Sequence, residues 1–144
     1  MKFGAIGSNY YLIRLEKGEE IISSLQKFAA SQNIDNAYFT GLGSIENPTL
    51  AHYLVTTKKY TEKKVEGIFE LLNITGNIAL FNDEPLVHSH VTLSDEEMNT
   101  KGGHLVTAVV SATVEIHLRV LDSVYEKRQD DEIGLKLFDL PDEV

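Results

Sequence analysis

The chain has 144 residues, of which 42% are hydrophobic, and its formal net charge is −9. These values fit one globular domain with a single core and exclude a disordered chain. The absence of cysteine excludes disulfides and thiolate metal sites. The acidic balance argues against direct binding of duplex DNA, which depends on lysine and arginine side chains that neutralise phosphates. No apolar run is long enough to span a membrane and the first residues show no apolar signal segment, so we expect a cytoplasmic protein.

The first half of the sequence predicts one helix between strands. We expect, in chain order, a strand at Tyr10–Leu15, a helix at Glu19–Gln32, a strand at Ala37–Thr40 and, after a turn at Pro48, a strand at Leu50–Thr56. The helix is amphipathic, because its apolar residues recur at helical spacing on one face. Glu19 and Glu20 are expected in its first turn, where they complement the helix dipole, and Asn33 is a plausible stop.

The second half predicts strands only. We expect a polar edge or loop at 58–66, a strand at Phe69–Phe81 with a bend or bulge at Gly76, a strand at Leu86–Leu93, a polar loop at 95–103 and strands at Leu105–Val110 and Thr113–Leu121. The prediction is therefore a single domain over residues 1–144, with its core at about 10–121 and a charged C-terminal tail at 122–144, in which residues 134–140 can add a short closing segment. The fold class is α+β, with a strongly curved, mostly antiparallel, barrel-like sheet and one main helix.

Three histidines are the candidate metal ligands. His88 and His90 lie in one predicted strand, where side chains alternate between faces, so both imidazoles point the same way about 6.5 Å apart. Gly102 and Gly103 let the backbone turn tightly and bring His104 back towards them. Three histidines with an open fourth position are typical of a reactive zinc site. The spacing alone leaves open the alternative of three unrelated histidines.

Other polar residues carry weaker signals. Glu115 shares a strand face with His117 and is a candidate to orient a ligand histidine from the second shell of the site, although a cross-strand ion pair is the simpler interpretation. His52 is expected to be structural, and the lysine pairs within 58–64 are expected to be solvated. The segment 41–44, Gly-Leu-Gly-Ser, lacks the Lys-Ser/Thr ending of a phosphate loop, so its small residues are expected to allow close backbone approach at a sheet or subunit contact.

Several of these segments together resemble the PPC (plant and prokaryote conserved) domain family. The segments, which appear in the family's order, are GLGSI at 41–45, GIFELLNITGNI at 67–78, HSHVTLS at 88–94, GGHL at 102–105 and ATVEI at 112–116. The resemblance covers about residues 11–121. It implies a homotrimer with a sheet-rich core and, as in prokaryotic members, a three-histidine metal site at the positions of His88, His90 and His104.

The resemblance implies function only broadly. Plant members carry an Arg-Gly-Arg-Pro AT-hook beside the domain, and this sequence has none, so the DNA-binding label often given to the family lacks its binding residues here. We expect a metal-binding trimer that acts as a regulatory or ligand-sensing module, with zinc as the metal and a possible small-molecule ligand on it. The alternative is a metal-dependent lyase or hydrolase similar in fold to acetolactate decarboxylase, in which the metal polarises a carbonyl or activates water. A protein that associates with DNA through a partner is a third reading. Fold resemblance does not decide between these readings, and catalysis is not the favoured one.

Overall fold

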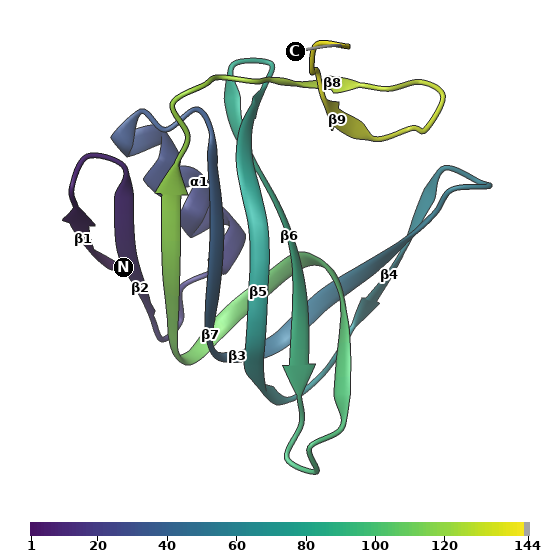
Figure 1. Ribbon diagram of the computed structural model, residues 1–144. Helices are drawn as coiled ribbons and strands as arrows, with labels where there is room; N and C mark the ends of the chain where they lie inside the picture. The colour runs from purple at the N-terminus through teal and green to yellow at the C-terminus, as the bar shows by residue number, and fades with distance from the viewer. Residues whose placement is uncertain (143–144) are drawn as a thin grey trace.

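The computed structural model describes residues 1–142 and shows one curved sheet, one helix and a small C-terminal hairpin (Figure 1). The elements are β1 (Lys2–Ile6), β2 (Tyr10–Glu16), α1 (Ile21–Gln32), β3 (Ala37–Leu54), β4 (Lys59–Lys64), β5 (Ile68–Phe81), β6 (Glu84–Ser94), β7 (Thr100–Val120), β8 (Lys127–Gln129) and β9 (Lys136–Phe138). All the strand pairs are antiparallel. Among the described residues no helix has the length and apolar character needed to cross a membrane.

The central strands close into a ring. The sheet order is β1-β2-β7-β6-β5-β3-β4, and β3 also pairs with β7, so β3, β5, β6 and β7 form a closed circuit of hydrogen bonds. Closure requires a strongly curved sheet, and it leaves these four strands without free edges inside the ring. The predicted α+β class with a curved, barrel-like antiparallel sheet is therefore confirmed.

Two long strands replace the shorter ones that the sequence suggested. The two predicted strands on either side of Pro48 are one strand, β3, and the two predicted strands between 105 and 121 are one strand, β7. Register shifts between Gly41 and Leu50 let β3 bend around the barrel without breaking its pairing. Pro48 was wrongly assigned to a turn because it lies at one of these irregular positions, where a missing N–H is tolerated.

Two positions of β3 require glycine because the backbone of β7 lies too close for a side chain. A Cβ on Gly41 would lie 2.4 Å from the Glu115 carbonyl oxygen, and one on Gly43 would lie 2.2 Å from the Thr113 carbonyl oxygen. Gly43 also has a φ of 157°, a positive value that residues with a side chain rarely adopt. These glycines let β3 cross close over β7, so they serve the sheet contact and give no support for a subunit contact.

The helix lies across the sheet and closes the core. It begins at Ile21, two residues later than predicted, so Glu19 and Glu20 do not lie in its first turn: Glu20 is the N-cap and accepts hydrogen bonds from the backbone N–H of Ile22 and Ser23. It ends at Asn33, whose φ of 52° is left-handed, as the sequence predicted. Phe28 is fully buried, and its ring makes edge contacts with Phe3 and Tyr11. β1, which carries Phe3, was not predicted from the sequence.

The segment that the sequence presented as a charged tail is tied to the domain. The buried Asn36 amide donates a hydrogen bond to the Tyr125 carbonyl oxygen, and its own oxygen accepts one from the Tyr125 backbone N–H. The chain then forms the β8–β9 hairpin, whose register pairs Lys127 with Phe138. Figure 1 shows this hairpin extending over the end of β5 and β6. The predicted closing segment thus exists as β9, although it pairs with β8 and not with the main sheet.

Candidate metal centre and its cavity

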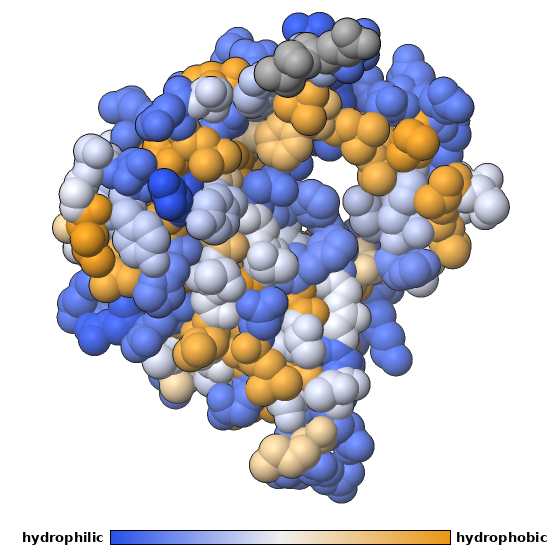
Figure 2. Space-filling view, viewed as in Figure 1, coloured by the Kyte–Doolittle hydropathy of each residue, from blue (hydrophilic) through white to orange (hydrophobic). Residues whose placement is uncertain are grey.

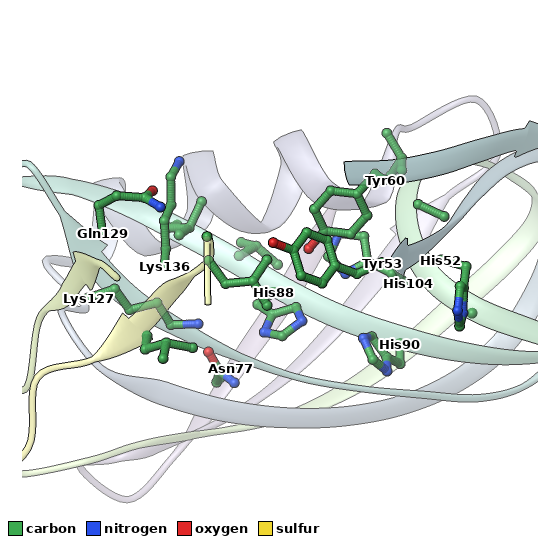
Figure 3. Close-up of a pocket in the computed structure, with 18 of the residues that line it drawn as sticks. His52, Tyr53, Tyr60, Asn77, His88, His90, His104, Lys127, Gln129 and Lys136 are labelled. Carbon is green, nitrogen blue, oxygen red and sulfur yellow. The ribbon is translucent and has the colours of Figure 1, made fainter. Parts of the chain in front are cut away.

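The three predicted histidines meet on one face of the barrel. His90 and His104 are direct cross-strand partners on β6 and β7, and His88 lies two residues before His90 on the same face. The ring centroids are 5.2 Å apart for His88 and His90, 5.1 Å for His88 and His104, and 5.5 Å for His90 and His104. One nitrogen from each ring lies within 4.8 Å of the other two, so the set could hold a metal ion (Figure 3).

The glycines before His104 act differently from the prediction. They do not make a turn, because β7 already begins at Thr100 and Gly102 pairs with Thr92 in the sheet. A Cβ on Gly102 would lie 2.4 Å from the Val91 carbonyl oxygen. Gly102 therefore permits the close approach of β6 and β7 that sets His90 opposite His104.

Burial keeps two of the imidazoles in the form that binds metals. Burial, followed by the positive charge of Lys127 and the two other histidines, lowers the pKa of His88 to about 4. Burial, followed by His90, also lowers the pKa of His104, while the Glu62 carboxylate acts in the opposite direction. Both rings are therefore neutral near pH 7, with a free nitrogen lone pair. A set of three imidazole nitrogen donors without thiolates or clustered carboxylates suits a borderline ion such as Zn²⁺.

The histidines open into a cavity of about 920 Å³. Its walls come from β3, β4, β5, β6 and β7 on one side and from the C-terminal hairpin on the other. The Tyr53 hydroxyl donates a hydrogen bond to the Ile133 carbonyl oxygen at 2.6 Å, and the Lys58 ammonium donates one to the Asp131 carbonyl oxygen at 2.8 Å. These contacts join the β3–β4 arm to the hairpin, and Figure 2 shows the opening that the two frame.

A glycine makes that junction possible. Gly134 has a φ of 83°, and a Cβ there would lie 2.6 Å from the Tyr53 hydroxyl oxygen. The hairpin can therefore turn tightly against the β3–β4 arm only with glycine at this position. The result is a bridge across the cavity mouth.

Three polar residues of the cavity escaped the sequence analysis. Lys127 is only 4% exposed, and burial lowers the pKa of its ammonium group. Asn77 pairs with His88 across β5 and β6, and its side-chain oxygen is buried without a hydrogen-bond partner among the described residues. Glu62 pairs with Ala51, which in turn pairs with His104, so a row across three strands sets Glu62 on the face of the histidines. Lys127 carried no sequence signal, since a lysine in a charged tail is normally solvated.

The other candidates lie elsewhere. Glu115 is exposed, pairs with Arg14 and Leu42, and does not line the cavity, so the structure does not bring it to the histidines of its own chain. Glu115 and His104 both lie in β7, but residues 105–114 separate them along the strand. His117 lies near Glu115 and shares a 2.7 Å hydrogen bond with the Tyr10 hydroxyl. His52 borders the cavity without joining the three histidines.

Comparison with known families identifies the domain. Residues 3–122 match the family described as the Plants and Prokaryotes Conserved (PCC) domain. The chain belongs to this family. The predicted resemblance to PPC proteins is confirmed, and the match ends before the C-terminal hairpin that closes the cavity.

Solved structures from three organisms share the fold over nearly the whole chain. A plant- and prokaryote-conserved (PPC) protein from Pyrococcus horikoshii is 31% identical, with a TM-score of 0.87, over 97% of this chain and 100% of that one. A protein from Bacteroides thetaiotaomicron, described as a candidate DNA-binding protein, is 26% identical, with a TM-score of 0.92, over 96% of each chain. A metal-containing protein from Archaeoglobus fulgidus is 27% identical, with a TM-score of 0.84, over 96% of this chain and 99% of that one. No curated protein matches the chain.

Proposed function

We propose that this PCC-domain protein is a homotrimeric metal-binding module that receives a small molecule at a zinc ion held by His88, His90 and His104. The observation that carries the proposal is the convergence of three imidazole nitrogens within 4.8 Å at the wall of a cavity of about 920 Å³. Closed structural zinc sites have four protein ligands, whereas three leave a position for an exchangeable molecule. The metal-containing relative from Archaeoglobus fulgidus supports the same reading.

Metal analysis of matched variants tests the site. Untagged protein, never exposed to a nickel column, is loaded with zinc, freed of excess ion and assayed for metal by elemental analysis. We expect about one ion per chain in the wild type and a loss of most of it in His90→Ala, since two imidazoles hold zinc poorly. His117→Ala is the control, because it removes an exposed strand histidine outside the cavity. Wild-type protein that stays well below one ion per histidine set contradicts the proposal.

Exposed apolar side chains support the trimer. Leu42, Ile68 and Leu72 are 58%, 66% and 50% exposed. The register of β3 and β5 sets Leu42 and Leu72 in the same stretch of the sheet, next to the bulges of both strands. An apolar surface of this kind is normally covered by a partner. Light scattering tests the assembly: a monomer at micromolar concentration contradicts it.

A metal-dependent lyase or hydrolase is the second candidate. The observation that favours it is Glu62, a carboxylate on the same face as the histidines and coupled to His104, which could accept or donate a proton beside the metal. Turnover of 2-hydroxy-3-keto acids or of simple esters by zinc-loaded protein, lost in Glu62→Gln, would favour this function over ligand sensing. The absence of turnover in zinc-loaded protein would favour the module.

Direct DNA binding is not part of the proposal. The net charge of −9 and the lack of an AT-hook both oppose binding to phosphates. The DNA-binding description belongs to the relative from Bacteroides thetaiotaomicron. A gel-shift titration with this chain alone is expected to show no specific submicromolar complex at physiological salt.

A further inference from the structure

Lys127 is a buried cation whose charge the described chain does not balance. It is 4% exposed, yet it takes part in none of the ion pairs found among residues 1–142. Its ammonium nitrogen lies 4.9 Å from the centre of the Phe138 ring, a contact that compensates only part of the lost hydration. Buried lysines are rare unless they are paired, because an isolated ammonium group loses its water.

The ammonium group faces the candidate metal centre. Lys127 lines the cavity together with the three histidines, and its positive charge acts on both His88 and His104. Figure 3 shows the nitrogen end of Lys127 directed towards His88 and Asn77. The Asn77 side-chain oxygen there is itself buried without a partner in the described part of the chain. Two polar groups in need of partners thus border the same space beside the histidines.

The charges of the cavity contrast with those of the molecule. The chain as a whole is strongly acidic. The cavity lining contains two lysines, Lys127 and Lys136, and one carboxylate, Glu62. A divalent ion on the histidines would make this space more positive still. Such a pocket favours an anion that is small enough to pass the bridge formed by the hairpin and the β3–β4 arm.

We propose that the cavity binds a small organic acid, whose carboxylate is held by Lys127 while a second oxygen of the same molecule, a hydroxyl or a carbonyl, binds the metal at the histidines. This inference rests on the proposed metal site and names the class of its ligand. The carboxylate supplies the negative charge that Lys127 lacks. A hard oxygen donor fills the coordination position that three histidines leave free. The C-terminal hairpin is then the part of the chain that selects acids over neutral molecules.

Cobalt-substituted protein tests the two claims separately. The visible spectrum of Co²⁺ first reports whether the histidines hold a metal. The protein is then titrated with a panel of 2-hydroxy and 2-oxo acids of three to six carbons that includes lactate. Propane-1,2-diol, which replaces the lactate carboxylate by a neutral CH₂OH group, is the matched uncharged probe, and inorganic phosphate is the alternative anion. We expect at least one acid to change the spectrum at millimolar concentration or below, and the diol to have no effect.

Variants of the hairpin assign the effect to Lys127. Lys127→Met should weaken acid binding about tenfold or more, as expected for the loss of a charge-assisted hydrogen bond, while cobalt still binds. Lys127→Arg keeps the charge and should retain part of the affinity. Lys27→Met, which removes an exposed lysine of α1 outside the cavity, is the control and should stay within about twofold of the wild type. Without any acid, Lys127→Met should melt at a higher temperature than the wild type, because it removes an unpaired buried charge.

The outcomes separate this inference from the metal site. A missing cobalt spectrum overturns both proposals. Bound cobalt that no acid perturbs, or acid binding that Lys127→Met leaves unchanged, overturns only the ligand assignment. Phosphate that binds more tightly than every acid overturns the organic-acid class. A trimer that dissociates in Lys127→Met, together with no acid binding, shows that a carboxylate of a neighbouring subunit pairs with Lys127, and this too overturns the assignment.

Discussion

Replacing Gly76 of β5 by alanine should destabilise the barrel where β5 pairs with β6, the strand that carries His88 and His90. A Cβ at this position would lie 2.4 Å from the His88 carbonyl oxygen, 2.6 Å from Cζ of Phe39 and 2.9 Å from Cβ of Ser89. None of these atoms can withdraw easily. The carbonyl belongs to the backbone of β6, the Phe39 ring is fully buried, and Gly76 pairs with both Phe39 and Ser89 in the ring of strands. The new methyl group must therefore push β5 and β6 apart.

The expected cost follows from two opposing effects. Overpacking of a well-packed site costs about 3 kcal/mol at the upper end of its usual range. Alanine recovers less than about 1 kcal/mol, because it restricts the unfolded chain. We therefore expect Gly76→Ala to lower the free energy of unfolding by about 2 kcal/mol. Because the main clash is with His88, the variant should also bind cobalt more weakly than the wild type.

Gly4→Ala is the matched control. Gly4 also lies in a strand, β1, but no heavy atom lies within 4 Å of its built Cβ. Urea unfolding followed by circular dichroism, at one fixed protomer concentration so that assembly contributes equally, compares the three proteins. Gly4→Ala should stay within about 0.5 kcal/mol of the wild type. A Gly76→Ala variant as stable as Gly4→Ala would refute the reasoning, since it would mean that β5 and β6 can separate without cost.

Three further predictions concern pH, the tail and assembly. Metal-free protein should lose stability as the pH falls from about 6.5 towards 4, because His88 takes up a proton at a higher pH in the unfolded chain than in the folded one. The loss in the free energy of unfolding is at most about 3 kcal/mol, at about 1.36 kcal/mol per pH unit. Urea unfolding measures it, and an equally steep loss in His88→Gln would argue against this origin. Asn36→Ala should cost about 1–3 kcal/mol, because it removes a buried amide that makes two hydrogen bonds to the Tyr125 backbone. It should also speed proteolytic cleavage after residue 121, and unchanged cleavage would count against a role of Asn36 in holding the C-terminal segment. Leu42→Glu should convert the trimer to monomers in light scattering, because it places a charge on the apolar surface proposed as the interface. Met98→Glu, at an even more exposed loop position, is the control and should leave the trimer intact. A trimer that survives Leu42→Glu would place the interface elsewhere.

The parts of the fold that follow local patterns were predictable. Tyr10–Leu15, the helix and the His88–His90 strand all showed their period in the sequence, and the structure has them within two residues of the predicted bounds. The histidines could be grouped because strand alternation and the order of the strands fix which side chains share a face. His104 was grouped with them because it follows two glycines after a polar loop, the family resemblance implied the same set, and the structure sets it directly opposite His90.

The errors arose where residues far apart in sequence decide the conformation. Gly76 was predicted as a bend, but its register is regular, and it is glycine because Phe39 and the His88 carbonyl approach it. Pro48 was taken as a turn because a proline in a barrel bulge has the same local signature as a proline in a loop. Lys127 could not be found at all, since its burial depends on a hairpin that contacts between distant residues, among them those of Asn36, Tyr53 and Lys58, hold in place.

The cavity is built from a part of the chain that the family model matches and a part beyond that match. The histidines and the barrel lie within residues 3–122, which match the family, whereas Lys127 and the β8–β9 hairpin lie beyond that match. A comparison limited to the matched residues therefore samples the scaffold and the metal ligands but omits one wall of the binding space. Exchange of some twenty C-terminal residues could change what enters the cavity without disturbing a single strand of the ring. A ligand or substrate known for one member of this family should accordingly be assigned to another member only after their hairpins, and not just their histidines, have been compared.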